Sequence, residues 1–166
     1  RDPGDSRSID QMVTERRQLL QSMIEKGELM LTPGIRELLE DLQSLHVPCA
    51  VVSSNGRGFI EIALNATGLS NYFKTLVCGD DAFLQGRTKP DPFPYLYAAK
   101  SIGIEPSHCV VVEDSMSGIQ SGLNAGMPVV VIATTATSEL ADKSIAGGVV
   151  ARIADFHYFP RSLFQS

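Results

Sequence analysis

Along this 166-residue chain, short runs of consecutive apolar residues alternate with longer stretches in which apolar residues recur every three or four positions. The short runs predict four strands, at residues 49–53, 75–79, 109–113 and 128–133. These runs are apolar at consecutive positions rather than at alternate ones. That pattern is typical of parallel strands whose two faces are both covered by helices.

The first helical stretch begins at Ser8, which forms a capping-box pattern with Gln11 three residues later. Val13, Leu19 and Leu20 belong to one apolar stripe along this helix. The stripe predicts that the helix packs one face against the rest of the protein.

The next helix is expected to open with Pro33 at a starting position. Three further helices are predicted at residues 57–67, 93–102 and 116–125. Residues 149–166 predict a last short strand and an aromatic segment that covers the core. Because strands and helices alternate, the fold class is predicted to be α/β, a doubly wound parallel sheet.

Composition limits the kinds of partner. An apolar content of 43% is enough for one sizeable core. A net charge of −5, without a basic patch, excludes nucleic acid as a partner. Cys49, Cys78 and Cys109 lie far apart in apolar runs, which indicates reduced thiols and a cytoplasmic protein rather than a zinc site. No apolar stretch is long enough to span a membrane, so no membrane partner is expected.

Polar residues stand where the predicted strands end. Ser53, Ser54 and Asn55 close the first strand, and Lys89 lies in a proline-rich loop. In a doubly wound sheet, ligands gather at the carboxyl ends of the strands, so these residues are expected to share one site. The hydroxyl and amide groups can hold phosphate oxygens, and the lysine can neutralise a phosphoryl group.

Glu113 and Asp114 follow the third strand at the point where a helix begins. Two adjacent carboxylates there can hold Mg²⁺ beside a phosphate. The structural alternative is that Asp114 or Ser115 only caps the helix. For Asp80 and Asp81 the structural interpretation is preferred, a helix cap followed by a surface charge.

Three segments carry a resemblance to a known family. Residues 51–55 (VVSSN), 88–92 (TKPDP) and 111–118 (VVEDSMSG) resemble the second, third and fourth motifs of the haloacid dehalogenase superfamily. The match is closest to its β-phosphoglucomutase-like and phosphoglycolate-phosphatase-like branch. The resemblance implies that residues 1–33 are the remnant of an α-helical cap, and that residues 34–166 are a Rossmannoid core lacking its first strand.

The same resemblance implies a chemistry for the site. Ser53 and Lys89 would be catalytic and would bind phosphate together with Ser54 and Asn55, while Glu113 and Asp114 would hold the cofactor Mg²⁺. The implied activity is hydrolysis of a phosphomonoester, a small phosphorylated metabolite of the sugar-phosphate or phosphoglycolate type.

The family's first motif, with its aspartate nucleophile, is missing from the sequence. We expect that aspartate upstream of Arg1 or on a second chain that completes the sheet, and we expect the 166 residues alone to be inactive. A catalytically inactive fragment that serves as a binding or interaction domain is therefore an open alternative.

Two other classes are weighed against the phosphatase. Gly56 and Gly58 follow a strand and precede Asp80, as in a dinucleotide-binding domain, but Glu61 stands where a third glycine is needed. A phosphoacceptor signalling domain uses similar groups, yet its acidic residues come first along the chain and its lysine last. Here the acidic pair comes last.

Overall fold

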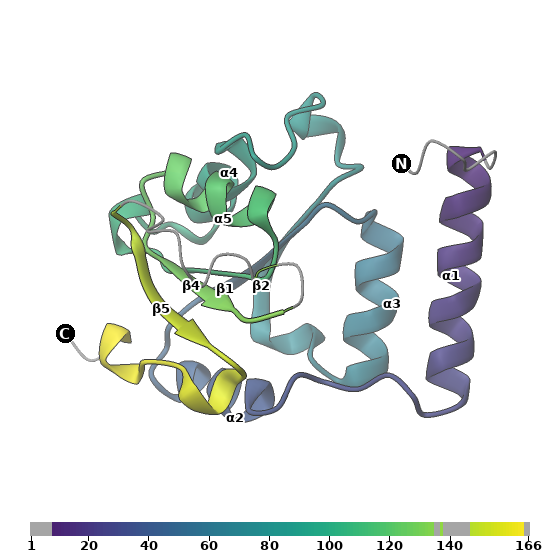
Figure 1. Cartoon of the computed structure of the whole chain (residues 1–166), viewed down its shortest axis with the longest axis horizontal. Coiled ribbons are helices and arrows are strands. Elements are labelled where there is room, and N and C mark those ends of the chain that lie inside the picture. The colour runs from purple at the N-terminus through teal and green to yellow at the C-terminus, as the bar shows by residue number, and fades with distance from the viewer. Residues whose placement is uncertain (1–7, 135–136, 138–146, 165–166) are drawn as a thin grey trace.

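The computed structural model of the chain describes residues 8–134, 137 and 147–164, and it has the predicted α/β fold (Figure 1). Its α-helices are α1 (Ile9–Glu25), α2 (Ile35–Ser44), α3 (Arg57–Thr67), α4 (Phe93–Ile102) and α5 (Met116–Asn124). Its strands are β1 (Cys49–Ser53), β2 (Phe73–Cys78), β3 (Val111–Glu113), β4 (Val129–Ile132) and β5 (Val149–Ile153). In this described part, no helix is both long enough and apolar enough to cross a membrane.

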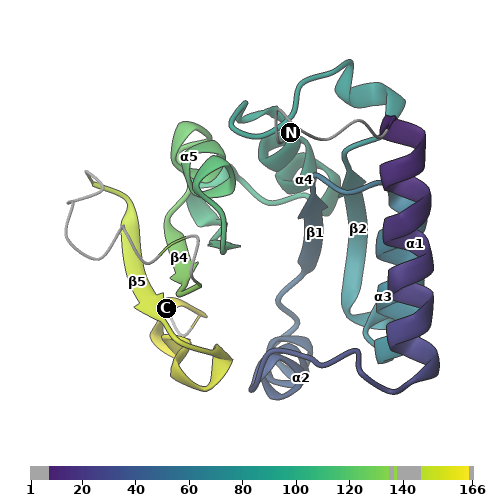
Figure 2. The same cartoon turned by 45° about the vertical axis from the view of Figure 1, so that its right-hand side comes forward.

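All the described strands are parallel, and they form two sheets. β1 pairs with β2, with Val51 opposite Leu76. The second sheet has the order β3-β4-β5, with Val112 opposite Val130. Within the described residues no ladder joins β1 to β3, and Figure 2 shows the β1–β2 pair standing apart from β4 and β5.

The two sheets nevertheless share buried side chains. One cluster combines Tyr95 of α4 and Ile119 of α5 with Val111 and Val129, and Val52 of β1 packs against it. Burial of these apolar groups stabilises the contact between the sheets, without any hydrogen bonds between their strands.

Helix α1 begins with the predicted capping box, since Gln11 N donates to Ser8 Oγ at 3.1 Å and Ser8 N donates to Gln11 Oε1 at 2.8 Å. Its apolar stripe is only partly buried. Leu20 is buried, but Val13 is 52% exposed and Leu19 62% exposed, so the predicted packing is wrong at these two positions. The reason is that α1 lies beside α3 and has no second helix over its outer face in the described residues (Figure 1).

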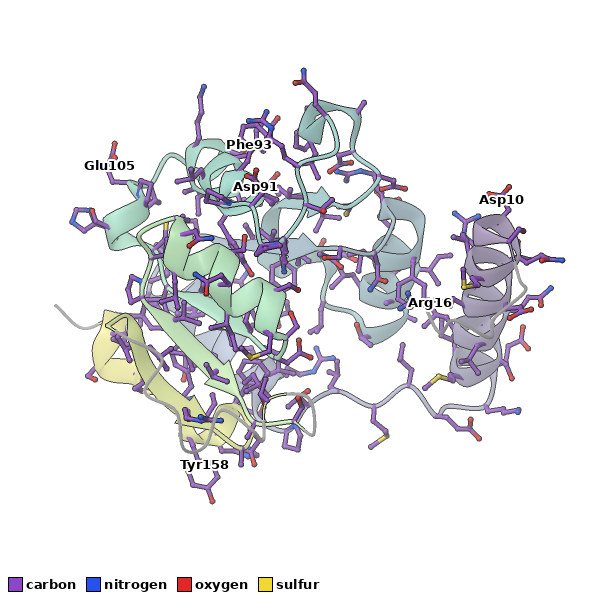
Figure 3. All side chains as sticks on the ribbon, turned by 45° about the horizontal axis from the view of Figure 1, so that its top comes forward. Asp10, Arg16, Asp91, Phe93, Glu105 and Tyr158 are labelled. Atoms are coloured by element: carbon purple, nitrogen blue, oxygen red, sulfur yellow. The ribbon has the colours of Figure 1, made fainter. Side chains whose placement is uncertain are left out.

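Helix α2 begins at Ile35, two residues after Pro33, so Pro33 belongs to the preceding turn rather than to the helix. The aromatic segment at the C-terminus packs as predicted. Phe159 is buried and stacks on Phe164, with ring centroids 5.5 Å apart. Tyr158 is the exception, because it is 71% exposed and points away from the body of the protein (Figure 3).

Candidate active site

Lys89 lies where the ends of β1 and β3 come together. Its Nζ donates a hydrogen bond to the carbonyl oxygen of Val52 at 2.9 Å and forms an ion pair with Glu113 Oε1. The side chains of Lys89 and Glu113 are only 8% and 7% exposed. Lys89, which lies in the loop before α4, thus links Val52 on one sheet to Glu113 on the other, 24 residues away from the lysine in the sequence.

The carboxylate of Glu113 is surrounded by donors. Its Oε1 accepts from the hydroxyl of Tyr95 at 2.5 Å as well as from Lys89. Its Oε2 accepts from Ser115 Oγ at 3.0 Å and from the backbone N–H of Asp114 at 3.2 Å. Burial alone would raise the pKa of Glu113, but the charge of Lys89 and these hydrogen bonds outweigh burial and hold that pKa below its usual value.

Helix α5 approaches this carboxylate closely. Ser115 is its N-cap, because Ser115 Oγ accepts from the N–H of Gly118 at 3.2 Å while also donating to Glu113. A Cβ atom on Gly118 would overlap the Glu113 carboxyl group. The site therefore requires glycine at position 118.

The loop that carries Lys89 is held by hydrogen bonds to the residues that follow the lysine. Ser121 Oγ of α5 donates to the carbonyl of Asp91 at 2.6 Å, and Asn124 Nδ2 donates to the carbonyl of Pro90 at 3.1 Å. The Asp91 carboxylate accepts from the N–H of Phe93 at 2.8 Å, at the start of α4, where Figure 3 shows the two residues side by side. These bonds hold the lysine's backbone in place.

The predicted phosphate-binding turn follows β1 directly. Ser53 Oγ accepts from the N–H of Asn55 at 3.1 Å, and the carbonyl of Asn55 accepts from the N–H of Gly79 at 2.9 Å. A cavity of about 10 Å³ separates Ser53 and Ser54 from Lys89. That volume suits about one water molecule, and both the serines and the lysine line it.

Asp114 is exposed, and within the described residues its carboxylate accepts no hydrogen bond. The hydroxyl of Thr134 donates to its backbone carbonyl at 3.3 Å. No group of three or more histidine, cysteine or acidic residues gathers around a point in the described part of the chain. Mg²⁺ needs no such cage, since it is commonly held by one or two carboxylates together with water and phosphate oxygens. Asp114 fits that role, whereas each oxygen of Glu113 already accepts two hydrogen bonds.

Asp80 and Asp81 lie outside this cluster. Asp80 accepts from the N–H of Arg57 at 2.8 Å, so it binds the N-terminus of α3 from a distant part of the chain rather than capping a helix that follows it. Asp81 is no surface charge, and that prediction is wrong: its side chain is 8% exposed and accepts from Arg57 Nε and Nη2, both at 2.9 Å. In a dinucleotide-binding domain the pyrophosphate sits at such a helix N-terminus. The Asp80 carboxylate there argues against that class.

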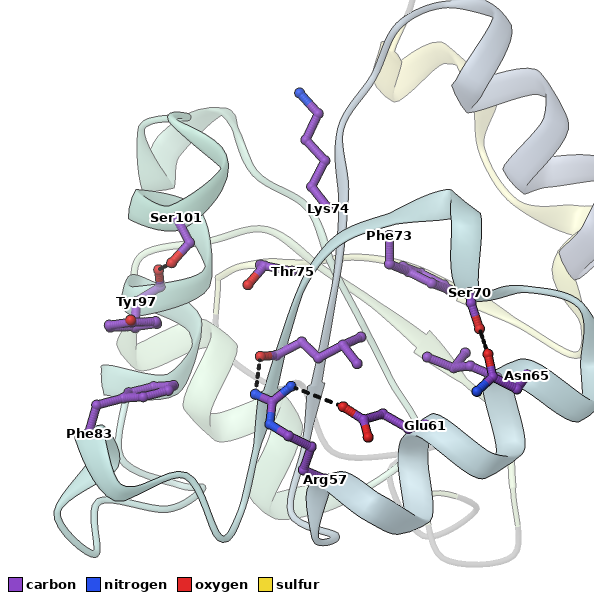
Figure 4. Close-up of a pocket in the computed structure, with 12 residues that line it drawn as sticks. Arg57, Glu61, Asn65, Ser70, Phe73, Lys74, Thr75, Phe83, Tyr97 and Ser101 are labelled. Carbon is purple, nitrogen blue, oxygen red and sulfur yellow. Dashed lines mark hydrogen bonds and ion pairs between the residues drawn. The ribbon is translucent and has the colours of Figure 1, made fainter.

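A much larger cavity, about 500 Å³, lies along the outer edge of β2 between α3 and α4 (Figure 4). On one side of it Arg57 donates to the carbonyl of Leu76 at 2.9 Å and lies 3.6 Å from Glu61. On the other side Phe83 and Tyr97 stack with ring centroids 4.0 Å apart. None of the residues predicted to bind phosphate or metal lines this cavity.

Three residues around the site were not singled out from the sequence: Tyr95, Ser121 and Asn124. Tyr95 could have been found, because it lies on the buried face of α4 and a buried tyrosine hydroxyl needs a polar partner. The other two are short polar residues of α5, and nothing in their sequence context distinguishes them from solvent-exposed positions. Ser115 is the helix cap that the sequence offered as an alternative.

Comparison with known proteins identifies one family and several similar phosphatases. The profile of the family described as Haloacid dehalogenase-like hydrolase matches residues 3–132. Validoxylamine A 7'-phosphate phosphatase of Streptomyces hygroscopicus subsp. limoneus is 38% identical over 106 residues, which are 64% of this chain and 48% of that protein. A probable pseudouridine-5'-phosphatase of Drosophila melanogaster is 32% identical over 154 residues, 90% of this chain and 64% of that protein.

Among solved structures, a HAD hydrolase of family IA, variant 3, from Entamoeba histolytica HM-1:IMSS superposes with a TM-score of 0.78 at 27% identity. The match covers 95% of this chain and 71% of that one. The chain spans less than two thirds of the length of the two curated relatives above.

Proposed function

The chain belongs to the haloacid dehalogenase-like hydrolase family, and we propose that it is part of a magnesium-dependent phosphatase acting on a small phosphomonoester. The observation that carries the proposal is the placement of Lys89, which is buried and held at the ends of two separate sheets beside Ser53. The two curated relatives named above are a phosphatase and a probable phosphatase of phosphorylated small molecules.

Lys89 and the turn after β1 would bind the phosphoryl group. An ammonium group has three N–H donors, and two of those on Lys89 are used by Val52 and Glu113. The third is available to a phosphoryl oxygen in the space that Lys89 shares with Ser53. Ser54 and Asn55 lie in the same turn and can contribute further donors. Fixed donors aimed at the transferring group stabilise the charge of the transition state.

The metal would be held chiefly by Asp114, since its carboxylate is exposed and has no partner in the described residues. When bound, Mg²⁺ would neutralise charge on the phosphoryl oxygens. Glu113 stands beside Asp114 and is also predicted to be a ligand, although it would first have to give up one of its hydrogen bonds. We therefore assign Glu113 mainly to holding Lys89.

We place the aspartate nucleophile on an extended segment outside residues 1–166, either an N-terminal segment or a second chain. Successive peptide groups along a strand point to alternate sides. The N–H of Val111 donates to the carbonyl of Pro128 just before β4, so the peptide groups of Val112 point away from β4. The carbonyl of Val52 accepts from Lys89. One parallel strand between β1 and β3 would pair with both edges and end beside Ser53 and Lys89.

Residues 1–33 are proposed to be the end of a cap that chooses the substrate, so the leaving group is not defined by this chain. Hydrolysis and phosphoryl transfer are both compatible with the site. The cytoplasmic compartment stays a prediction of the sequence.

The test compares the 166-residue chain with a longer protein that includes its natural upstream sequence. Phosphate release from p-nitrophenyl phosphate is measured with and without Mg²⁺. The longer protein should turn over with Mg²⁺, and Lys89→Ala should lower its rate by about 10²-fold or more, while Lys100→Ala on the exposed side of α4 should not. Turnover by the 166 residues alone, lost on Lys89→Ala, would contradict the external nucleophile.

The second candidate function is a non-catalytic phosphate-binding domain. It is favoured by the missing first motif. A longer protein that binds inorganic phosphate through Lys89 but releases none from p-nitrophenyl phosphate would support this candidate over the phosphatase.

A further inference from the structure

We propose that Tyr95 is a positioning residue for Lys89: its hydroxyl fixes the Glu113 carboxylate, and the carboxylate directs the lysine's remaining N–H toward the phosphoryl site. This inference rests on the function proposed for Lys89. It assigns a role in the site to a residue outside the three motif segments.

The contacts that carry the proposal meet at one oxygen atom. Glu113 Oε1 accepts both from the Tyr95 hydroxyl at 2.5 Å and from the ammonium of Lys89. Lys89 Nζ also lies 5.0 Å from the centre of the Tyr95 ring, over its face. The phenol therefore contacts the lysine directly through its ring and indirectly through the carboxylate.

The other hydrogen bonds of the Glu113 carboxylate explain why the Tyr95 hydroxyl is needed to fix its orientation. Oε2 is held by Ser115 and by the backbone of Asp114 on the α5 side, and Oε1 is held by Tyr95 on the α4 side. With both oxygens fixed, the carboxylate cannot rotate, and Lys89 is left with one direction for its third N–H. Without the hydroxyl, Oε1 is fixed only by the lysine that it is supposed to orient, so the carboxylate and the ammonium can move together.

A purely structural role for Tyr95 is the competing explanation, since its ring is 8% exposed and packs in the core with Val111 and Ile119. Tyr95→Phe separates the two roles, because phenylalanine keeps the ring and removes only the hydroxyl. Tyr97→Phe is the matched control. Tyr97 is two residues further along the same helix, and its hydroxyl makes no hydrogen bond within the described residues.

The first measurement is NMR of the lysine ammonium groups in the 166-residue chain labelled with ¹⁵N-lysine. A buried, hydrogen-bonded ammonium exchanges its protons slowly with water, so Lys89 should give a signal that disappears on Lys89→Arg. Tyr95→Phe should speed that exchange about tenfold, and Tyr97→Phe should leave it unchanged. An unchanged Lys89 signal in folded Tyr95→Phe would overturn the proposal.

A second readout uses the unmodified chain, in case Tyr95→Phe does not fold. The hydroxyl proton of Tyr95 should be visible, slowly exchanging and close to the Lys89 ammonium by nuclear Overhauser effect. A Tyr95 hydroxyl that exchanges freely would contradict the proposal.

Titration with inorganic phosphate in the presence of Mg²⁺ distinguishes this inference from the proposed function. Tyr95→Phe should bind phosphate about tenfold more weakly than the wild type, and Tyr97→Phe should bind it as tightly as the wild type. This result supports both the positioning role and the proposed function. A different result is that Tyr95 orders Lys89 but neither the 166-residue chain nor the longer protein binds phosphate. That result would contradict the proposed function and support the positioning role. Phosphate binding that is equal in all three proteins would refute the positioning role alone.

Discussion

Two ion pairs at different places in the molecule differ in burial and in how many of their hydrogen-bonding groups are already used. Arg57, which pairs with Asp81, lines the cavity of about 500 Å³, and its side chain is 38% exposed. Lys89 and Glu113 are both nearly buried, beside a cavity of only about 10 Å³. Cavity size alone would favour the first pair as the functional one.

The donors that remain available favour the second pair. The guanidinium of Arg57 is engaged by the Asp81 carboxylate and the carbonyl of Leu76, with Glu61 close by. Lys89 keeps one N–H for a ligand, and the neighbouring Asp114 carboxylate has no partner in the described residues. A binding site needs groups whose interactions are incomplete in the free protein, and that property separates the two regions better than volume does.

Breaking the buried pair should have the largest effect on stability. Lys89→Met leaves the Glu113 carboxylate buried without its cation, which is expected to lower the free energy of unfolding by about 3–5 kcal/mol. Urea denaturation measures this loss. Lys100→Met, at an exposed position on α4, should change stability by less than about 0.5 kcal/mol. A Lys89→Met protein as stable as the wild type would show that the pair is not formed in solution.

A larger side chain placed against the Lys89–Glu113 pair should have the next largest effect on the free energy of unfolding. Gly118→Ala places a methyl group against the Glu113 carboxyl, and overpacking of this kind costs about 1–3 kcal/mol. The sign is informative, because alanine is the better helix former by about 1 kcal/mol. Ser117→Ala, at the exposed neighbouring position of α5, is the control, again by urea denaturation. Stabilisation by Gly118→Ala would mean that α5 lies further from the site.

Low pH should weaken the Lys89–Glu113 pair, because it protonates the Glu113 carboxylate. The pKa of Glu113 is lower in the folded chain than in the unfolded one, where it is about 4.3. Its contribution is therefore fully present above the unfolded pKa and is lost as the pH falls through the folded pKa. Glu113→Gln should flatten the acid limb of stability against pH, by at most about 1.4 kcal/mol per pH unit. Identical acid limbs for the two proteins, measured by urea denaturation from pH 3 to 6, would contradict the direction of the shift.

The pair of Arg57 and Asp81, whose arginine is partly exposed, should show the smallest effect on stability. Arg57→Met is expected to couple to Asp81→Asn by about 0.2–1 kcal/mol in a double-mutant cycle, as is usual for solvent-screened ion pairs. It should leave the binding of inorganic phosphate unchanged. If Arg57→Met weakened phosphate binding as much as Lys89→Met, the two regions would have to be treated as one site.

The sequence by itself determined the secondary structure and predicted the residues around which the candidate site is built. The capping box at Ser8, the three helices after β1 and the continuous apolar strands were predictable because caps and periodicity act over a few residues. The meeting of Lys89 with Glu113 followed from one general rule, that ligands collect where parallel strands end. The family's motifs then indicated phosphate chemistry.

Only the tertiary structure decided which side chains complete the site and which do not. The bond of Tyr95 to Glu113 spans 18 residues, and that of Arg57 to Asp81 spans 24. The exposure of Val13 and Leu19 and the separation of β1 from β3 likewise depend on how whole elements pack. A local pattern shows that one face of a helix is apolar or that an acidic residue follows a strand. Which residue of another element that face or acid contacts is fixed by three-dimensional packing, which no local pattern encodes.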